Sequence, residues 1–371
     1  MSFTVGLDAR FASARYDGVG RYVAALAEEL PRADDSVRLI IVPPPDDDPP
    51  SRRLPAANGR VRSLAPRRAR RAESPWALWE MPWLARRAAV DVWHTPFPLA
   101  APQRRPPLVV TLHDCIPERF PSYFGTARRL AYLASVSVAV RAARVVVVPS
   151  QMTADDAQRF HRVPASRIRV IPEGVSSPAD ADDRDDAEML RSLAVHEPYV
   201  LTVGRPRPHK NYTTVVRALS RIDARRRPLL VRVGRDDPRL RDGSSDLAAA
   251  LGVRLLALEG VSDAALHALY RRAALVAIPS AVEGFGLPLL EALACGAPVL
   301  ARDIQPLCAA GDGVAQFVAG GIAVWASAIE GAIDDRAWHE RARRDGPQRA
   351  AMFPWRRTAE QTLAAYREVA A

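Results

Sequence analysis

Short β-branched runs alternate with longer amphipathic stretches along the whole chain. In the first half these runs are FTVGLDA, VRLIIVP, DVWHTP, PLVVTLHD and ARVVVVPS, and in the second half YVLTVGR, LLVRVGR, VRLLALEG, ALVAIPS and APVLARD. Apolar runs separated by helix-length segments are typical of parallel strands covered by helices. The pattern therefore predicts an α/β fold with two doubly wound units. In such sheets ligands bind outside the carboxyl ends of the strands, so the residues that follow these runs are the candidates for chemistry.

A polar, acidic stretch lies between the two series of strands. It follows RIRVIPEGVS and reads SPADADDRDDAEML, with few apolar residues. Such a composition is typical of a linker or of the solvated start of a helix. We therefore expect a domain boundary here, with a linker over residues 177–195. A second acidic run, in PPPDDDPPSRRLP, is flanked by prolines and indicates a solvated loop rather than a metal site.

Size and charge limit the classes of partner. At 371 residues the chain is longer than one hydrophobic core usually organises, and its formal net charge of +10 favours an anionic partner. Nucleic acid, a phosphorylated metabolite and an anionic membrane surface all fit this charge. We disfavour nucleic acid because no aromatic residues are interleaved with the arginines on a predicted strand or recognition helix.

The cysteines and the apolar segments indicate a cytoplasmic protein. Cys115, Cys295 and Cys308 are widely spaced and show neither a disulfide framework nor a zinc motif. The opening MSFTVGLDAR has no secretory pattern, and Arg141 and Arg144 interrupt the most apolar window. We expect at most a peripheral association with the inner face of the cell membrane.

Lys210 is the one lysine among 52 basic residues, and it lies in the stretch GRPRPHKN. A lysine carries a compact ammonium on a flexible stem, whereas an arginine carries a planar fork, so the two differ where a point charge must fit a confined anion. Lys210 and the residues around it therefore indicate a phosphate-binding site; the alternative is that one lysine survived by chance.

The segment PSAVEGFGLPLLEALACGAPVL, residues 279–300, predicts a strand, a glycine loop, a helix and a strand. Glycines in the loop would let a ligand approach the backbone amides, and Gly296 is placed to end the helix. The amino terminus of that helix would then favour a diphosphate. Glu283 and Glu291 lie eight residues apart and can accept hydrogen bonds from sugar or ribose hydroxyls. An ordinary helix start with a glycine turn is the alternative interpretation.

This segment resembles the E-x7-E signature of the retaining glycosyltransferases of family 4, which have the GT-B architecture. Other segments resemble that family in the expected order over almost the whole chain: DARFASARYDGVGRY, VVTLHDCIPERFPSYF, RIRVIPEGV, YVLTVGRPRPHKN, GVSDAALHALYRRAALVAIPS and FPWRRTAEQTLAAYRE. The resemblance implies two Rossmann-like domains facing each other across a cleft. It implies an acceptor-binding domain over 1–176, a nucleotide-sugar-binding domain over 196–352, and a helix over 353–371 that packs back on the first domain.

The same resemblance implies roles for individual residues. Arg205 and Lys210 match the basic pair that neutralises the donor diphosphate as the glycosidic bond breaks. Glu291 matches the carboxylate that holds the ribose hydroxyls, and Glu283 the one beside the donor sugar. His113, directly after the run LVVTL, matches a histidine that reaches the donor sugar. The other donor-binding positions are Gly18 and Gly20 in the loop after the first strand, Val261 beside the nucleobase, and Gly284, Phe285, Gly286 and Leu287.

The family is associated with retention of the anomeric configuration by front-face displacement. The donor would be a nucleotide sugar such as GDP-mannose or a UDP-sugar. No Asp-x-Asp motif follows a predicted strand, so we expect no catalytic metal and no cofactor. The chain departs from the family pattern at Gln151, at Glu173 and in IQPLCAAGDG. Those departures concern the finer acceptor or donor contacts and leave the diphosphate-binding residues intact.

The acceptor side offers the arginine- and tryptophan-rich segment RRARRAESPWALWEMPWLARR, residues 67–87. Trp76, Trp79 and Trp83 recur at helical spacing between arginine clusters. They could lie on an anionic bilayer beside a lipid-linked acceptor. Alternatively they pack into the amino-terminal core while the arginines stay in water, which is the interpretation we favour on sequence alone.

The sequence thus predicts a retaining hexosyltransferase, with mannose as the favoured sugar and a glycan or lipid-linked acceptor in polysaccharide or glycolipid synthesis. Two alternatives stay open. One is a sugar-nucleotide epimerase or phosphorylase on the same fold, and the other is a basic nucleic-acid-binding protein.

Overall fold

The structure is a computed structural model that describes residues 2–13, 17–45, 53–68, 71–72, 74, 76–100, 102–103, 105–123, 126–178, 183–236 and 242–371. The acidic run 46–48 and Arg70 therefore lie outside the described residues. The chain divides into two compact units. The first comprises Met1–Gly174 and Phe353–Ala371, and the second comprises Val175–Met352.

The first unit is built on a parallel sheet. Its strands are β1 (Phe3–Leu7), β2 (Val37–Ile41), β3 (Val61–Ser63), β4 (Val92–Thr95), β5 (Leu108–Thr111), β6 (Val145–Val148) and β7 (Ile168–Val170), in the order β3-β2-β1-β4-β5-β6-β7. The strand order reverses between β1 and β4. Both faces of the central strands are buried, which explains why β4, β5 and β6 are apolar without alternation.

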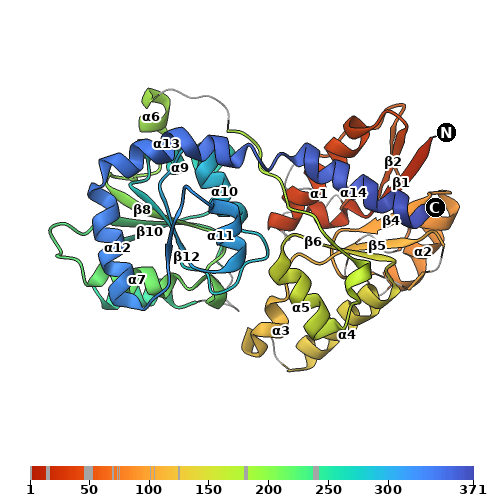
Figure 1. The fold of residues 1–371 in the computed structure, drawn as a ribbon, viewed down its shortest axis with the longest axis horizontal. Coiled ribbons are helices and arrows are strands. Elements are labelled where there is room, and N and C mark those ends of the chain that lie inside the picture. The colour runs from red at the N-terminus through yellow and green to blue at the C-terminus, as the bar shows by residue number, and fades with distance from the viewer. Residues whose placement is uncertain are drawn as a thin grey trace. The chain divides into compact units, whose positions relative to one another are not determined.

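Helices cover the two faces of this sheet. One apolar cluster joins β1 and β2 to α1 (Asp17–Ala33) and α14 (Trp355–Ala370), and Figure 1 shows these two helices side by side. The other cluster joins β5 and β6 to α2 (Ala77–Arg87), α4 (Thr126–Ala142) and α5 (Gln151–His161). Shorter helices are η1 (Ala9–Ala12), α3 (Ile116–Arg119), η3 (Pro121–Tyr123) and η4 (Ala165–Arg167).

The carboxyl-terminal helix α14 belongs to the first unit although it is last in sequence. Tyr366 forms a hydrogen bond of 2.6 Å with His94 on β4, and the Thr358 hydroxyl donates to the Pro172 carbonyl at 2.9 Å. The chain leaves this unit at Gly174 directly beside Trp355, where a Cβ on residue 174 would lie 2.5 Å from a backbone nitrogen. Only a glycine fits that crossing.

The second unit repeats the same plan with a parallel sheet of its own. Its strands are β8 (Tyr199–Val203), β9 (Leu229–Val233), β10 (Leu255–Leu258), β11 (Leu275–Ile278), β12 (Val299–Arg302) and β13 (Gln316–Val318), in the order β10-β9-β8-β11-β12-β13. This is the strand order of a dinucleotide-binding sheet, with its reversal between β8 and β11. The helices are α6 (Asp183–Ser192), η5 (Pro208–Lys210), α7 (Tyr212–Ser220), α8 (Ser244–Ala250), α9 (Asp263–Arg272), α10 (Leu287–Ala294), α11 (Gln305–Gly311), α12 (Ile322–Asp334) and α13 (Arg336–Ala350).

The predicted linker over 177–195 is wrong for most of its described length. Residues 179–182 lie outside the described residues, but 183–192 form helix α6, which packs on α9 within the second unit. Buried Asp186 makes a two-pronged ion pair of 2.7 Å with Arg271, and Leu190 is buried as well. One apolar residue and one paired acid are enough to dock a helix whose composition is that of a solvated segment.

Two edge strands, β3 and β13, escaped the sequence pattern because each has three residues and too little apolar character to stand out. Gly18 and Gly20 were expected in a loop, but they lie in the first turn of α1, which begins at Asp17. The amphipathic segment after the glycines forms helix α1, and the helix includes both glycines in its first turn.

Candidate functional site

The strand reversal in the second unit brings two loops together. One follows β8 and carries Arg205 and Lys210, and the other follows β11 and carries Glu283. The two loops are bonded to each other, since the Ala281 amide donates to the His209 carbonyl at 2.7 Å. Ligands of open α/β sheets bind at this reversal, so the structure places three predicted site residues where a ligand is expected.

Lys210 and Glu283 form an ion pair. The ammonium nitrogen lies 2.7 Å from Oε1 of Glu283, with 16% and 9% of the two side chains exposed. An ammonium has three N–H donors. Within the described residues, the Glu283 oxygen is the one acceptor that Lys210 contacts, so two donors remain for a ligand. The pair thus holds a cation at the surface of the loop without using up its hydrogen-bonding capacity.

Two glycines meet beside Lys210, so the backbone there carries no Cβ atoms of its own. Gly204 has a φ of +125°, and a Cβ on it would lie 3.8 Å from the Lys210 ammonium. Gly234, at the end of β9, has a φ of +156°, and its Cβ would lie 2.2 Å from the Gly204 carbonyl oxygen and 3.0 Å from the Arg205 nitrogen. Glycine at 234 therefore sets the path of the chain that presents Arg205.

Helix α10 begins directly after the loop that carries Glu283. Gly286 occupies its N-cap with a φ of +102°, and a Cβ there would lie 2.7 Å from Leu307. Gly284 and Leu287 are partly exposed, whereas Phe285 is buried and anchors the loop. Gly296, with a φ of +70°, follows the helix end as the sequence predicted. The amino end of α10 thus directs the positive end of its dipole toward the loop that carries Glu283, while the amides of Leu289 and Leu290 donate to the Gly286 carbonyl.

Glu291 lies one turn into α10 and is held from a neighbouring helix. The hydroxyl of Tyr270, at the end of α9, donates to Oε2 of Glu291 over 3.2 Å. Val261 lies in the loop between β10 and α9 and is half-buried. It follows the edge strand β10, which is two strands away from β8 at the reversal.

In the first unit, His113 follows β5 and is bonded on both sides of its ring. Nδ1 lies 2.7 Å from the Glu173 carboxylate, and Nε2 donates to the Pro96 carbonyl at 2.9 Å. Burial by itself lowers the pKa of His113, but the hydrogen bond and charge of Glu173 and the Pro96 carbonyl outweigh it, so the pKa lies above its ordinary value. Tyr22 packs edge-on against the ring at 4.9 Å. The ring is therefore held in one orientation, and its protonated form is favoured.

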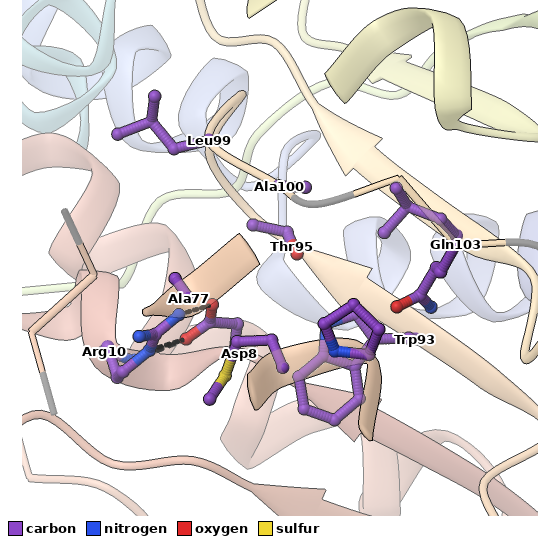
Figure 2. A pocket seen from close by; sticks show the side chains of 11 residues that line it. Asp8, Arg10, Ala77, Trp93, Thr95, Leu99, Ala100 and Gln103 are labelled. Atoms are coloured by element: carbon purple, nitrogen blue, oxygen red, sulfur yellow. Dashed lines mark hydrogen bonds and ion pairs between the residues drawn. The ribbon is translucent and has the colours of Figure 1, made fainter. Parts of the chain in front are cut away.

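The strand reversal of the first unit lies beside a small pocket. Asp8 follows β1 and makes a buried two-pronged ion pair with Arg10, with atoms 2.5 and 2.7 Å apart, as Figure 2 shows. Thr95 ends β4 on the same side, and Met81 of α2 also lines the space. The free volume is comparable to one water molecule. None of the predicted site residues lines this pocket.

The arginine- and tryptophan-rich segment corrects the interpretation favoured from sequence. The structure shows that the tryptophans do not pack into the core, since Trp76, Trp79 and Trp83 are 51%, 77% and 46% exposed. The opposite face of α2 is buried through Met81, Leu84 and Ala85. A helix with apolar residues on both faces can bury one face and leave the other in solvent, which spacing alone does not decide.

Three residues that the sequence did not nominate support the site. Glu173 orients His113, Tyr270 holds Glu291, and Gly234 shapes the backbone before Arg205. The sequence contained a local signal for two of these residues, Glu173 and Gly234. Glu173 comes shortly after β7, and Gly234 ends a strand in the same Val-Gly-Arg order as Gly204. The Tyr270 contact depends on how α9 packs on α10 and has no local signal.

Two family models match consecutive parts of the chain. The model described as Glycosyltransferase Family 4 matches residues 16–177, and the model described as Glycosyl transferases group 1 matches residues 187–349. Among relatives, a D-inositol 3-phosphate glycosyltransferase of Mycobacterium marinum is 33% identical over 79% of this chain and 62% of its own length. The D-inositol 3-phosphate glycosyltransferase of Nocardia farcinica is 36% identical over 58% of this chain and 51% of its own length. The match thus spans about half to two thirds of these relatives.

Solved structures with the same fold align with nearly the whole chain. A sucrose-phosphate synthase from Thermosynechococcus elongatus has a TM-score of 0.74 and 20% identity, with 99% of each chain covered. HepE from Anabaena, in complex with UDP-glucose, has a TM-score of 0.70 and 19% identity, with 98% of this chain and 100% of that chain covered. These likenesses confirm the predicted fold class, GT-B, with two α/β domains that each hold a parallel sheet. No helix in the described part of the chain is long and apolar enough to cross a membrane.

Proposed function

Because the chain belongs to glycosyltransferase family 4, we propose that it is a retaining hexosyltransferase that takes its sugar, mannose by preference, from a nucleotide sugar. The acceptor is a glycan or a lipid-linked molecule in polysaccharide or glycolipid synthesis. The observation that carries the proposal is the Lys210–Glu283 ion pair beside Gly204, at the strand reversal of the second unit. A donor diphosphate would accept from the free N–H groups of Lys210, from Arg205 and from the amides at the start of α10.

The chemistry follows from where charge develops. As the bond between sugar and diphosphate breaks, negative charge gathers on the leaving phosphate oxygens. Cations and amides that already lie in place lower the barrier because they need no reorganisation at that moment. Glu291 would accept from the ribose hydroxyls and Glu283 from the donor sugar, while the bond to Lys210 holds the Glu283 carboxylate in place. His113 stays a predicted contact of the donor sugar, and Glu173 and the Pro96 carbonyl hold its ring in one orientation. These cations take the electrostatic role of a metal, so the proposal includes no catalytic metal ion.

A panel of nucleotide sugars tests the proposal. A donor that binds the native state raises its Tm, and the same compound should release its nucleoside diphosphate only when an acceptor is present. Inositol phosphates belong in the acceptor panel because of the relatives' name, and HepE in complex with UDP-glucose places UDP-glucose beside GDP-mannose in the donor panel. Conversion of a nucleotide sugar to its epimer without acceptor would instead establish the alternative reaction. Full activity without Mg²⁺, unchanged when Mg²⁺ is added, is expected.

The exposed tryptophans of α2 favour a second element of the proposal, a peripheral association with an anionic membrane. Their rings are flanked by guanidinium groups, with Arg68 5.1 Å from the Trp76 ring and Arg87 5.2 Å from the Trp83 ring. The Glu80 carboxylate accepts from the backbone amides of Arg67 and Arg68, the second at 2.7 Å, and so ties the basic segment to the helix. Tryptophans bordered by arginines are typical of helices at the headgroup level of anionic bilayers.

Vesicle sedimentation tests this membrane surface. Binding to vesicles with anionic lipid, absent with neutral lipid and lost at high salt, is expected for the native chain. Replacing Trp76, Trp79 and Trp83 by alanine should abolish it. A matched control replaces the exposed residues Val324 and Met352, which lie in the second unit, by alanine and should bind as before. Binding that survives loss of the tryptophans, or that fails at low salt, would remove the membrane from the proposal.

A further inference from the structure

Three residues with metal-binding side chains meet inside the first unit, away from the strand reversals. Cys115 directly precedes α3, Glu118 lies on α3, and His161 is the last residue of α5. Their sulfur, carboxylate and imidazole ligand atoms all lie within 4.8 Å of one another. The three residues are 1%, 8% and 5% exposed. A mixed thiol, carboxylate and imidazole set is thus enclosed between two helices.

The hydrogen bonding of this cluster is incomplete. The Nε2 atom of His161 lies 2.8 Å from Oε1 of Glu118, which uses one polar atom of each residue. The remaining atoms, Oε2 of Glu118 and Nδ1 of His161, are buried and have no hydrogen-bond partner within the described residues. Buried polar atoms are costly to leave unsatisfied, and each such atom in a folded protein calls for a partner.

The electrostatic surroundings favour a cation. The carboxylates of Glu118, Asp114 and Asp156 act on the Cys115 thiol with negative charge, and Arg119 acts on it with positive charge. Arg119 itself is bound to Asp156 through two hydrogen bonds of 2.7 Å. Carboxylates therefore outnumber cations around the thiol. A divalent cation would reverse the balance and stabilise the thiolate.

We propose that Cys115, Glu118 and His161 bind a divalent transition-metal ion, zinc in the first place. Thiolate, imidazole and carboxylate are the ligand types of zinc, and three of them leave one tetrahedral position for water. On binding, the thiol proton goes to solvent, and the metal replaces the hydrogen bond between Glu118 and His161.

The ion would join α3 to the carboxyl end of α5. Since Cys115 lies two residues after His113, the metal would also fix the loop that carries that histidine. Its role is therefore to position the loop and not to take part in sugar transfer.

Cobalt(II) titration of the full chain, untagged and cleared of metal, tests the site. We expect about one ion bound per chain, with the near-ultraviolet charge-transfer absorption of a thiolate–cobalt bond, and displacement of cobalt by zinc. Cys115→Ser should lose the absorption and weaken binding at least tenfold. Cys308→Ser and Cys295→Ser are matched controls, the first chosen because its thiol lies 3.1 Å from an Asp303 oxygen, and both should bind as the native chain does.

Thermal unfolding gives an independent measurement. Zinc should raise the Tm of the native chain and of Cys308→Ser, but not that of Cys115→Ser. Should Cys115→Ser fail to fold, Glu118→Gln, which keeps a hydrogen-bond partner for His161, serves in its place. Absence of bound cobalt in the native chain, or a thiolate absorption that persists in Cys115→Ser, would overturn the proposal. No measurement here depends on glycosyl transfer, so the outcome is separate from that of the proposed function.

Discussion

Each unit holds a cation–carboxylate pair at the carboxyl edge of its sheet, and the two pairs differ in what they leave available. His113 and Glu173 lie 2.7 Å apart, as do Lys210 and Glu283. Both ring nitrogens of His113 are bound to the protein, through Glu173 and the Pro96 carbonyl. Lys210 contacts one acceptor among the described residues and borders the glycine backbone at Gly204. The two ion pairs have the same length, but only Lys210 keeps hydrogen-bond donors available for a ligand.

The difference indicates separate tasks. An ammonium with free donors beside glycine backbone suits an anion that arrives and leaves, which is what a diphosphate does. An imidazole bonded at both nitrogens is held in one orientation, and its charge depends on pH. We therefore expect changes at Lys210 to affect catalysis far more than stability, and changes at Glu173 to affect both in a pH-dependent way.

Replacing Lys210 by alanine should have the largest effect. We expect kcat to fall by about 100- to 1,000-fold, because the charge on the leaving diphosphate loses a preformed cation. Lys210→Arg should also be impaired, since a planar fork does not replace the point charge. Steady-state kinetics on the donor identified by the panel measures this. Arg225→Ala, an exposed position in the same unit, is the control and should retain native rates. Near-native turnover in Lys210→Ala would contradict the task assigned to the pair.

Gly234→Ala should come next and tests whether the glycine-lined backbone matters. The new Cβ would lie 2.2 Å from the Gly204 carbonyl oxygen, so the chain before Arg205 must move. We expect the free energy of unfolding in urea to fall by about 3 kcal/mol, with a loss of donor binding. The control Gly252→Ala has a φ of +62° and open space around its Cβ, so it should cost only about 1 kcal/mol. Equal costs for the two variants would argue against a special path at Gly234.

Glu173→Gln should have an intermediate effect that depends on pH. In the folded chain the pKa of His113 is raised, so its pairing contributes fully below the unfolded pKa of about 6.5 and is lost as the pH rises through the folded pKa. The variant should therefore be less stable than the native chain by about 2 kcal/mol near pH 6, and the gap should narrow toward pH 9. Urea unfolding across this range measures it. If the difference in unfolding free energy between the native chain and the variant stays constant or increases with pH, Glu173 does not act through His113.

Tyr270→Phe should have the smallest effect. Without its hydroxyl, Glu291 loses a donor at 3.2 Å and is held less firmly toward a ribose. We expect the KM for the donor to rise about threefold with kcat unchanged, as for an interaction equal in ground and transition states. Tyr199→Phe removes another buried hydroxyl, which donates to the Leu269 carbonyl at 2.7 Å, and serves as the control. A raised KM in both variants would assign the effect to general loosening of the unit.

The hydrophobic pattern along the sequence predicted the strands well, but it did not predict which helix faces are buried in the core. Each of the ten apolar runs predicted as strands contains a strand, and most of these strands are buried on both faces and therefore apolar throughout. The tryptophans of α2 were misplaced for the opposite reason, since a helix with two apolar faces carries no mark of which one meets the core. The short strands β3 and β13 and the docked helix α6 were missed because their burial depends on one or two residues each.

The sequence by itself determined the two parallel sheets and the loop–helix segment with Glu283 and Glu291, and it marked Lys210 as the one lysine, because each of these features involves residues close together along the chain. Tertiary structure decided which distant residues meet: Lys210 with Glu283 across 73 positions, His113 with Glu173 across 60, and Glu118 with His161 across 43. These contacts depend on strand order and helix packing, which local spacing does not specify, and they decide which charges are neutralised, held or left for a ligand.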